Sequence, residues 1–130
     1  MESITGHCVD SDILIDYLRG VAKARRFLLQ ASKRTALYIS VVSIAEIYSG
    51  KETRQPKKRE RIETFLQNFV TIEVDWGIAE RAGELRRDYQ KPFADAIVAA
   101  SAITNKLRLV TRNTKHFRGI KGLKLLRPYY

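Results

Sequence analysis

The stretch HCVDSDILIDYLRG, residues 7–20, joins a short apolar strand to a helix through a single polar turn. The strand is expected to end at Asp10, and Ser11 or Asp12 can cap the helix by accepting hydrogen bonds from its first backbone N–H groups. Gly20 stands where such a helix commonly ends. The apolar side chains in between recur at helical spacing, at Ile13, Leu14, Tyr17 and Leu18. The stretch therefore predicts a strand–turn–helix unit with a carboxylate at the end of the strand.

The same alternation of strand and helix continues along the sequence. Further strands are expected at residues 36–40, 70–74, 107–111 and 123–126, and further helices at residues 21–33, 42–50, 56–69, 76–90 and 94–106. Pro56 suits the start of one helix, Asp75 can cap the next, and Pro92 separates that helix from the last. Strands that alternate with helices favour an α/β fold, with a central parallel sheet of about five strands and helices on both faces.

The composition fits a single globular domain in a reducing compartment. The chain has 130 residues, 45% of them hydrophobic, which is enough to bury a core without disulfide bonds. Cys8 is the only cysteine, so a disulfide-rich secreted module is excluded and the cytoplasm is expected. No apolar run approaches the ~20 residues of a membrane span. Residues 1–10 carry Glu2 and no basic segment, so a signal peptide is not expected.

Basic residues outnumber acidic ones and fall in two clusters. The chain has 24 Lys and Arg against 14 Asp and Glu, a formal net charge of +10, which favours a polyanionic partner such as a nucleic acid, an acidic protein or an anionic membrane. The clusters comprise Lys51, Arg54, Lys57, Lys58, Arg59 and Arg61, and then Lys106, Arg108, Arg112, Lys115, Arg118, Lys121, Lys124 and Arg127. Arg112, Lys115, Lys57 and Lys58 are candidates for contact with a nucleic acid. The ordinary alternative is a solvated helix face and a soluble tail.

Four polar side chains fall where the crevice of a parallel sheet is expected, outside the carboxyl ends of the strands. Asp10 ends the first strand, Glu46 lies in the helix after the second, Asp95 opens the apolar helix 94–106, and Asn113 follows the fourth strand. Each also has a local explanation. These are a turn or cap for Asp10, a capping box with Ser43 for Glu46, a favourable helix N-terminus for Asp95, and a turn for Asn113.

Convergence of these carboxylates would carry an electrostatic cost. Helix 94–106 is apolar nearly all round, so Asp95 is expected to be buried. Two carboxylates at about 4 Å repel by roughly 4 kcal/mol at an effective dielectric of about 20. A divalent cation, lysines and arginines, or protons can neutralise such a cluster. Hard oxygen donors favour Mg²⁺ or Mn²⁺, whereas His7 and His116 are too few and too far apart for a zinc site.

Several segments resemble the successive motifs of PIN-domain ribonucleases. They are CVDSDILIDYLRG (8–20), YISVVSIAEIYSG (38–50), ADAIVAASAI (94–103), LVTRNTKHF (109–117) and IKGLKLLRPY (120–129). The toxins of VapBC toxin–antitoxin systems are the members that they resemble most. The likeness runs through nearly the whole chain in order. It implies a single PIN domain over residues 1–130 and a Mg²⁺- or Mn²⁺-dependent endoribonuclease activity.

The resemblance also implies roles for individual residues. Asp10, Glu46 and Asp95 match the family's acidic residues and are expected to bind the metal and take part in catalysis. Asn113 stands where the wider family often has Asp, so it is expected to orient the attacking water. The supporting residues are expected to be Ser11, Ser43 and Thr111, as hydrogen-bond partners of these side chains, with Asp12 at the edge of the site and Asp16 on the helix surface.

The partners that the resemblance implies are an RNA substrate, a cognate antitoxin protein and a second copy of the chain in a homodimer. The antitoxin would lay an amphipathic segment into a groove beside the active site. Tyr17, Leu18, Ile47 and Tyr48 could line such a groove, or be ordinary core residues.

Three other interpretations stay open at this point. A receiver-like signalling domain would use Asp10, Asp12, Asp75 and Thr111, but the strong positive charge does not suit it. A nuclease of the same fold could act on DNA or in RNA maturation. A PIN domain that binds RNA without catalysis is the third interpretation, and only Asn113 favours it.

Overall fold

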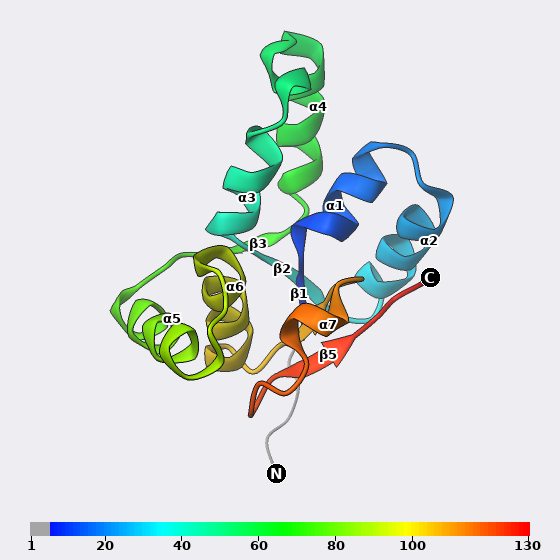
Figure 1. The fold of residues 1–130 in the computed structure, drawn as a ribbon. Helices are drawn as coiled ribbons and strands as arrows, with labels where there is room; N and C mark the ends of the chain where they lie inside the picture. Colours follow the sequence, from blue (N-terminus) through cyan, green and yellow to red (C-terminus); the bar gives the residue numbers. More distant parts are fainter. Residues whose placement is uncertain (1–5) are drawn as a thin grey trace.

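The computed structural model describes residues 6–130, and its centre is one sheet of five parallel strands (Figure 1). The strands are β1 (Gly6–Val9), β2 (Ala36–Ser40), β3 (Val70–Ile72), β4 (Arg108–Val110) and β5 (Lys124–Leu126), in the order β3-β2-β1-β4-β5. The predicted α/β class is confirmed. Residues 1–5, on which part of the expectation about a signal peptide rests, lie outside the described residues.

β1 occupies the middle of the sheet. Cys8 pairs with Tyr38 of β2 on one side and with Leu109 of β4 on the other. The next strands along the chain, β2 and β3, follow on the first side, and β4 and β5 complete the second. In a parallel sheet, a crevice forms outside the carboxyl ends of the strands where the strand order reverses in this way. The carboxyl end of β1 therefore lies at that point.

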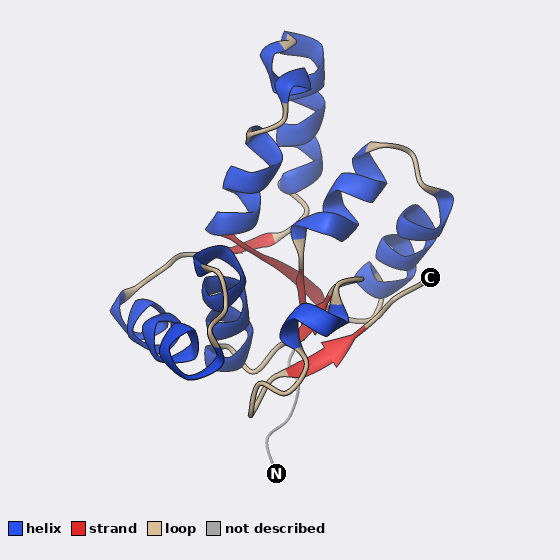
Figure 2. Cartoon of the chain, in the orientation of Figure 1, coloured by secondary structure: helices blue, strands red, loops and turns tan. Residues whose placement is uncertain are grey.

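Helices enclose the sheet on both faces (Figure 2). They are α1 (Ser11–Leu18), α2 (Ala22–Ser32), α3 (Val41–Tyr48), α4 (Pro56–Leu66), α5 (Trp76–Tyr89), α6 (Phe93–Thr104) and α7 (Thr114–Phe117), with a 3₁₀ helix η1 (Lys51–Arg54) between α3 and α4. The first six match the helices expected from the sequence. The short elements α7 and η1 were not predicted, because four residues are too few to show a periodic pattern.

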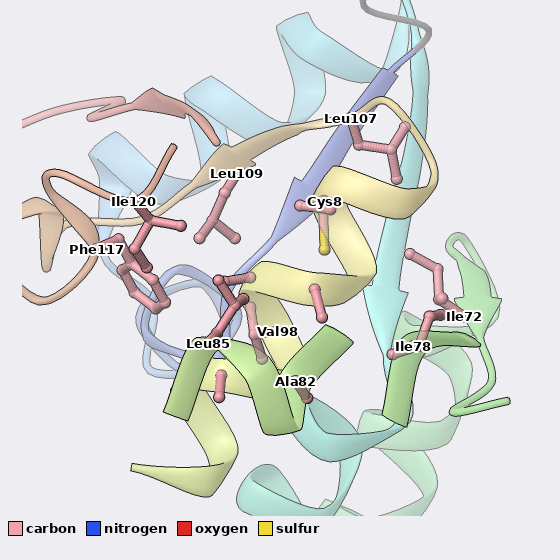
Figure 3. Close-up of a cluster of buried hydrophobic side chains, with 14 residues drawn as sticks. Cys8, Ile72, Ile78, Ala82, Leu85, Val98, Leu107, Leu109, Phe117 and Ile120 are labelled. Carbon is pink, nitrogen blue, oxygen red and sulfur yellow. The ribbon is translucent and has the colours of Figure 1, made fainter. Parts of the chain in front are cut away.

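Each face of the sheet carries its own hydrophobic core, because successive residues of a strand point to opposite faces. In β1, Cys8 packs with α5, α6 and α7, whereas Val9 packs with α1, α2, α3 and α4. Leu109 and Val110 of β4 divide in the same way. Figure 3 shows the first core, in which the side chains of α5 and α6 meet Cys8 and Leu109. Its small residues on α6 are Ala96, Ala99, Ala100 and Ala102, all fully buried.

The segment from α3 through η1 to α4 extends away from the sheet as a helical arm (Figure 1). Pro56 occupies the first turn of α4, as predicted, and Asp75 caps α5 by accepting a hydrogen bond from the Ile78 N–H (2.9 Å). The first basic cluster lies on η1 and α4, where Lys57 and Lys58 are exposed. Within residues 6–130, no helix has the length and apolarity to cross a membrane.

Candidate active site

Asp10 lies directly after β1 and is held from both neighbouring segments. Its backbone N–H donates to the Val110 carbonyl (2.9 Å), which continues the contact with β4. Its side chain, and not that of Ser11 or Asp12 as expected, caps α1, since one carboxylate oxygen accepts from the Ser11 N–H (2.9 Å). The other oxygen accepts from the Thr111 hydroxyl (2.9 Å). Only 8% of Asp10 is exposed, so its carboxylate is fixed within the crevice rather than free on the surface.

The environment of Asp10 disfavours its negative charge. Burial and the neighbouring Asp12 carboxylate, with a smaller contribution from Glu46, raise the pKa of Asp10 to about 7. Hydrogen bonds from Thr111 and from the Ser11 N–H lower it, but by less. Burial also raises the pKa of Asp12. The carboxyl end of β1 therefore concentrates negative charge, which a bound cation would relieve.

Glu46 lies inside α3, and the cap of that helix is another residue. The Ser40 hydroxyl caps α3 by accepting from the Val42 N–H (3.1 Å), so the proposed capping box of Ser43 and Glu46 is wrong. Ser43 is fully buried one turn into the helix. Its hydroxyl has no hydrogen-bond partner within residues 6–130. The structure thus leaves the Glu46 carboxylate available for contacts outside its own helix.

Ser11 links the end of β1 to helix α3. Its backbone N–H donates to Asp10, and its hydroxyl donates to a carboxylate oxygen of Glu46 (3.0 Å). Asp10 and Glu46 are therefore drawn to the same point by one intervening residue, although 36 positions separate them in the sequence. Glu46 is exposed, whereas Asp10 is buried.

Thr111 and Asp12 tie the end of β4 to the start of α1. Thr111 is fully buried, and its oxygen accepts from the Asn113 N–H (3.1 Å) while its hydrogen is directed to Asp10. One Asp12 oxygen accepts from the Arg112 N–H (2.8 Å) and lies 3.4 Å from the Thr111 hydroxyl. Asp12, expected at the edge of the site, thus holds the backbone that carries Asn113. The Asn113 side chain is exposed at the start of α7 and does not cap that helix.

The exposure of Asp95 differs from the expectation. It lies in the first turn of α6, where the positive end of the helix favours a carboxylate, but 27% of its side chain is exposed. The predicted burial is therefore wrong: the buried side chains of α6 begin at Ala96 and face the sheet. The Asp95 carboxylate lies 3.8 Å from His116 Nδ1 of α7, a weak contact with a side chain that is itself mostly exposed.

The carboxylates that the sequence predicts as metal ligands are not assembled as a finished metal site. Within residues 6–130, no group of three His, Cys, Asp or Glu side chains is close enough to hold one ion together. The chemistry of the donors nevertheless fits a hard divalent cation: they are carboxylate oxygens, and burial and mutual repulsion raise the pKa of Asp10, the most enclosed of them. Asp10 and Glu46 are joined through Ser11, whereas Asp95 approaches from α6, which packs against α3 and α7.

A second cluster beside Asp10 has no counterpart in the sequence analysis. Asp16, expected on the surface of α1, is only 13% exposed at its side chain, so that expectation is wrong. Its carboxylate pairs with the Arg112 guanidinium (3.0 Å) and accepts a hydrogen bond from the Tyr129 hydroxyl (2.8 Å). We call these three residues the arginine clamp. No sequence motif marks Tyr129 as the partner of a residue 113 positions away.

The receiver-like interpretation does not fit this arrangement. It requires Asp75, after β3, to lie next to Asp10, after β1. In the structure β2 separates β1 from β3, and the Asp75 carboxylate is used to cap α5.

Two adjoining hollows flank the arm. The first, about 570 Å³, lies between α1, α3, η1 and α4, with Glu46 in its wall together with Leu18 and Ile47. The second, about 740 Å³ and more open, is lined by Tyr17, Leu18 and residues of α2 and α4, and Tyr17 stacks on Phe65 there (4.2 Å between ring centroids). Of the four side chains expected in a groove, Tyr17, Leu18 and Ile47 line these hollows. Tyr48 is not among their lining residues and stacks under Arg59 instead.

The chain is similar to known proteins in both sequence and structure. The PIN domain family model matches residues 7–123 of the chain. "Ribonuclease VapC10" of Mycobacterium tuberculosis is 39% identical over 121 residues, which cover 89% of each chain. The "tRNA(fMet)-specific endonuclease VapC" of Shigella flexneri is 30% identical over 107 residues, 76% of this chain and 78% of that protein.

The solved structures include a toxin–antitoxin complex from Klebsiella pneumoniae. One chain of that complex superposes with a TM-score of 0.83 and 33% sequence identity, covering 95% of this chain and 98% of the other. The similarity therefore extends over nearly the whole of this chain.

Proposed function

The chain belongs to the PIN-domain family, to its VapC-type toxins, and from this membership we propose that it is a divalent-metal-dependent endoribonuclease. Mg²⁺ or Mn²⁺ is the cofactor that we propose. The observation that carries the proposal is the Asp10 carboxylate, which is buried at the carboxyl end of β1, where the strand order reverses. Burial, together with the neighbouring Asp12 and Glu46 carboxylates, raises its pKa to about 7. Because this environment disfavours the negative charge of Asp10, a bound cation would stabilise the site. The net charge of +10 suits a polyanionic substrate.

Asp10, Glu46 and Asp95 would hold the cation, which when bound polarises the scissile phosphodiester and lowers the pKa of the attacking water. Asp10 provides the fixed ligand, because Ser11 and Thr111 prevent it from turning. Glu46 and Asp95 lie nearer the surface and can move toward it. Within the described residues, 6–130, the Asp95 side chain makes only the 3.8 Å contact with His116.

The remaining side chains position the attacking water or accept its proton. Asn113 orients the attacking water through its amide, since its backbone is fixed by Thr111 (3.1 Å) and its exposed side chain does not cap α7. Glu46, which is exposed, accepts a proton from that water. Ser43, three residues before Glu46 in α3, is the proposed supporting residue of that carboxylate, and its buried hydroxyl makes no hydrogen bond within residues 6–130.

The partners that we propose are RNA, an antitoxin and a second copy of the chain. Arg112, Lys115, Lys57 and Lys58 would neutralise phosphates of the RNA on two sides of the crevice. The hollow beside Glu46, with Leu18 and Ile47 in its wall, suits an amphipathic segment of an antitoxin, as expected for the toxin of a type II system. The free and buried Cys8 is consistent with action in the cytoplasm.

A digest of total cellular RNA with the purified chain tests the proposal. Cleavage in Mg²⁺ or Mn²⁺, none in EDTA, and none by Asp10→Asn, Glu46→Gln or Asp95→Asn is the expected result. Thermal melting in EDTA should show all three variants folded. Cleavage that persists in EDTA, or that survives Asp10→Asn, would refute the metal-dependent mechanism.

The same digest separates the competing functions. RNA bound but not cleaved in either metal would favour a non-catalytic PIN domain, an interpretation that the neutral Asn113 and the unassembled ligand set favour. Preferential cleavage of DNA, or trimming of precursor RNA at one site without general toxicity, would favour the other nuclease roles.

A further inference from the structure

The arginine clamp brings together three segments that lie far apart in the sequence. Asp16 lies on α1, Arg112 follows β4, and Tyr129 lies in the segment after β5, which runs back toward α1 and α2 (Figure 1). The Tyr129 hydroxyl donates to one Asp16 oxygen (2.8 Å). The Arg112 Nε lies 3.0 Å from the same oxygen as an ion pair, and an Nη nitrogen donates to the other oxygen (3.4 Å).

Arg112 is held at both ends. Its backbone N–H donates to Asp12 (2.8 Å), and its guanidinium meets Asp16 one turn further along the same helix. The neighbours of Arg112 in the sequence are Thr111, which contacts Asp10, and Asn113. The clamp therefore holds the guanidinium on Asp16 of α1, in a residue whose backbone contacts Asp12 and which follows Thr111, the partner of Asp10.

The contacts of Asp16 show that it is not a further member of the acidic cluster. Both of its oxygens are occupied, by Arg112 and by Tyr129. Arg112, in contrast, is only partly enclosed: 40% of its side chain is exposed, and a guanidinium has more N–H donors than this pair uses. The clamp thus fixes the guanidinium without consuming its capacity to bind an anion.

We propose that Arg112 binds a phosphate of the RNA next to the one that is cleaved, and that Asp16 and Tyr129 are positioning residues that hold its guanidinium for this contact. This proposal rests on the proposed function, and in it Asp16 and Tyr129 act on RNA binding without touching the substrate.

The physical advantage of the clamp is preorganisation. A free arginine loses rotamer freedom when it binds a phosphate, and a planar fork that is already held loses less. The segment that carries Tyr129 is itself anchored, since Lys23 of α2 donates to the Tyr130 carbonyl (2.9 Å). Tyr129 therefore restrains Asp16, and Asp16 restrains Arg112.

Binding and cleavage of one substrate test the proposal. The probe is a fluorescein-labelled oligoribonucleotide of about 12 nucleotides with an unpaired loop, since sites for single strands span several nucleotides. Anisotropy in EDTA gives Kd, and cleavage in Mg²⁺ gives KM and kcat. The variants are Arg112→Ala, Asp16→Asn, Tyr129→Phe and the double variant Arg112→Ala/Tyr129→Phe. Tyr130→Phe is the matched control, a tyrosine of the same segment that is 86% exposed.

Arg112→Ala should weaken binding about tenfold, because a charge-assisted contact with phosphate is lost. Tyr129→Phe should weaken it about threefold, because Asp16 loses a hydrogen-bond donor and holds Arg112 less firmly. Both should raise KM with kcat within about twofold of the wild type. The double variant should bind no more weakly than Arg112→Ala alone, because Tyr129 acts only through Arg112. Asp16→Asn should fall between the two single variants, and Tyr130→Phe should match the wild type.

The proposal is overturned if Arg112→Ala binds like the wild type, if Tyr129→Phe and Asp16→Asn both do so, or if the losses add in the double variant. Additive losses would assign Tyr129 a purely structural role. If the wild type binds the probe but does not cleave it, the proposed function is wrong. The Kd values of the variants alone then test whether the arginine clamp supports RNA binding. If the wild type binds no RNA, both are wrong.

Discussion

Replacing Asp10 by Asn should stabilise the metal-free protein above neutral pH. The folded state raises the pKa of Asp10 from 3.8 to about 7, so between these values the folded state binds a proton that the unfolded state has released. The contribution of Asp10 to the stability of the wild type therefore falls as the pH rises through this window and is lowest above pH 7. About three pKa units correspond to a penalty of at most about 4 kcal/mol at pH 8.

The asparagine side chain in the Asp10→Asn variant carries no charge and therefore escapes that penalty. Its carbonyl oxygen can accept from the Ser11 N–H, and its amide can donate to the Thr111 oxygen, so the shape of the site is kept. We expect Asp10→Asn to be more stable than the wild type by about 2–4 kcal/mol at pH 8, and by less than about 1 kcal/mol at pH 4.5.

Urea unfolding in EDTA at several pH values between 4.5 and 8 provides the measurement. Asp88→Asn is the control, because that exposed carboxylate pairs with Arg87 and its pKa is lowered rather than raised. Mg²⁺ should then stabilise the wild type and leave Asp10→Asn unchanged, because only the wild type keeps the ligand. Parallel stability curves for wild type and Asp10→Asn from pH 4.5 to 8 would refute the electrostatic reasoning.

Three further predictions concern neighbouring contacts. Glu46→Gln should abolish cleavage while the variant remains folded in EDTA; unchanged turnover would remove Glu46 from the mechanism. Thr111→Val should lower the free energy of unfolding by about 1–3 kcal/mol, because Asp10 and the Asn113 N–H lose a buried partner, and a change below about 0.5 kcal/mol in urea would contradict this. The double variant Lys57→Glu/Lys58→Glu should weaken RNA binding and flatten its salt dependence, measured as log Kd against log salt concentration, and an unchanged slope would exclude phosphate contacts by these lysines.

Local patterns were sufficient to predict the fold from the sequence. The strand–turn–helix unit at residues 7–20 and the run of alanines near residue 100 each fix their own secondary structure, and the alternation of elements then requires a parallel sheet. Asp10 and Thr111 lie together because β1 pairs with β4. Their contact therefore follows from the strand order and needs no special side-chain pattern.

The parts that could not be predicted depend on tertiary contacts. Ser40 and Ser43 are both plausible caps for α3, and only the position at which β2 ends selects Ser40. Asp95 belongs to an apolar helix, but its place in the first turn leaves it partly exposed. Asp16 and Tyr129 look like ordinary surface residues in the sequence, and their pairing depends on where the segment after β5 returns to α1.

The central position of β1 also determines when the site can form during synthesis. Asp10 is translated early, but the hydroxyl that fixes its carboxylate belongs to a residue 101 positions later, and Arg112 follows that residue. A nascent chain that has not yet released β4 from the ribosome has an unpaired edge on β1 and no assembled crevice. The crevice can therefore assemble only after β4 has been translated and has paired with β1.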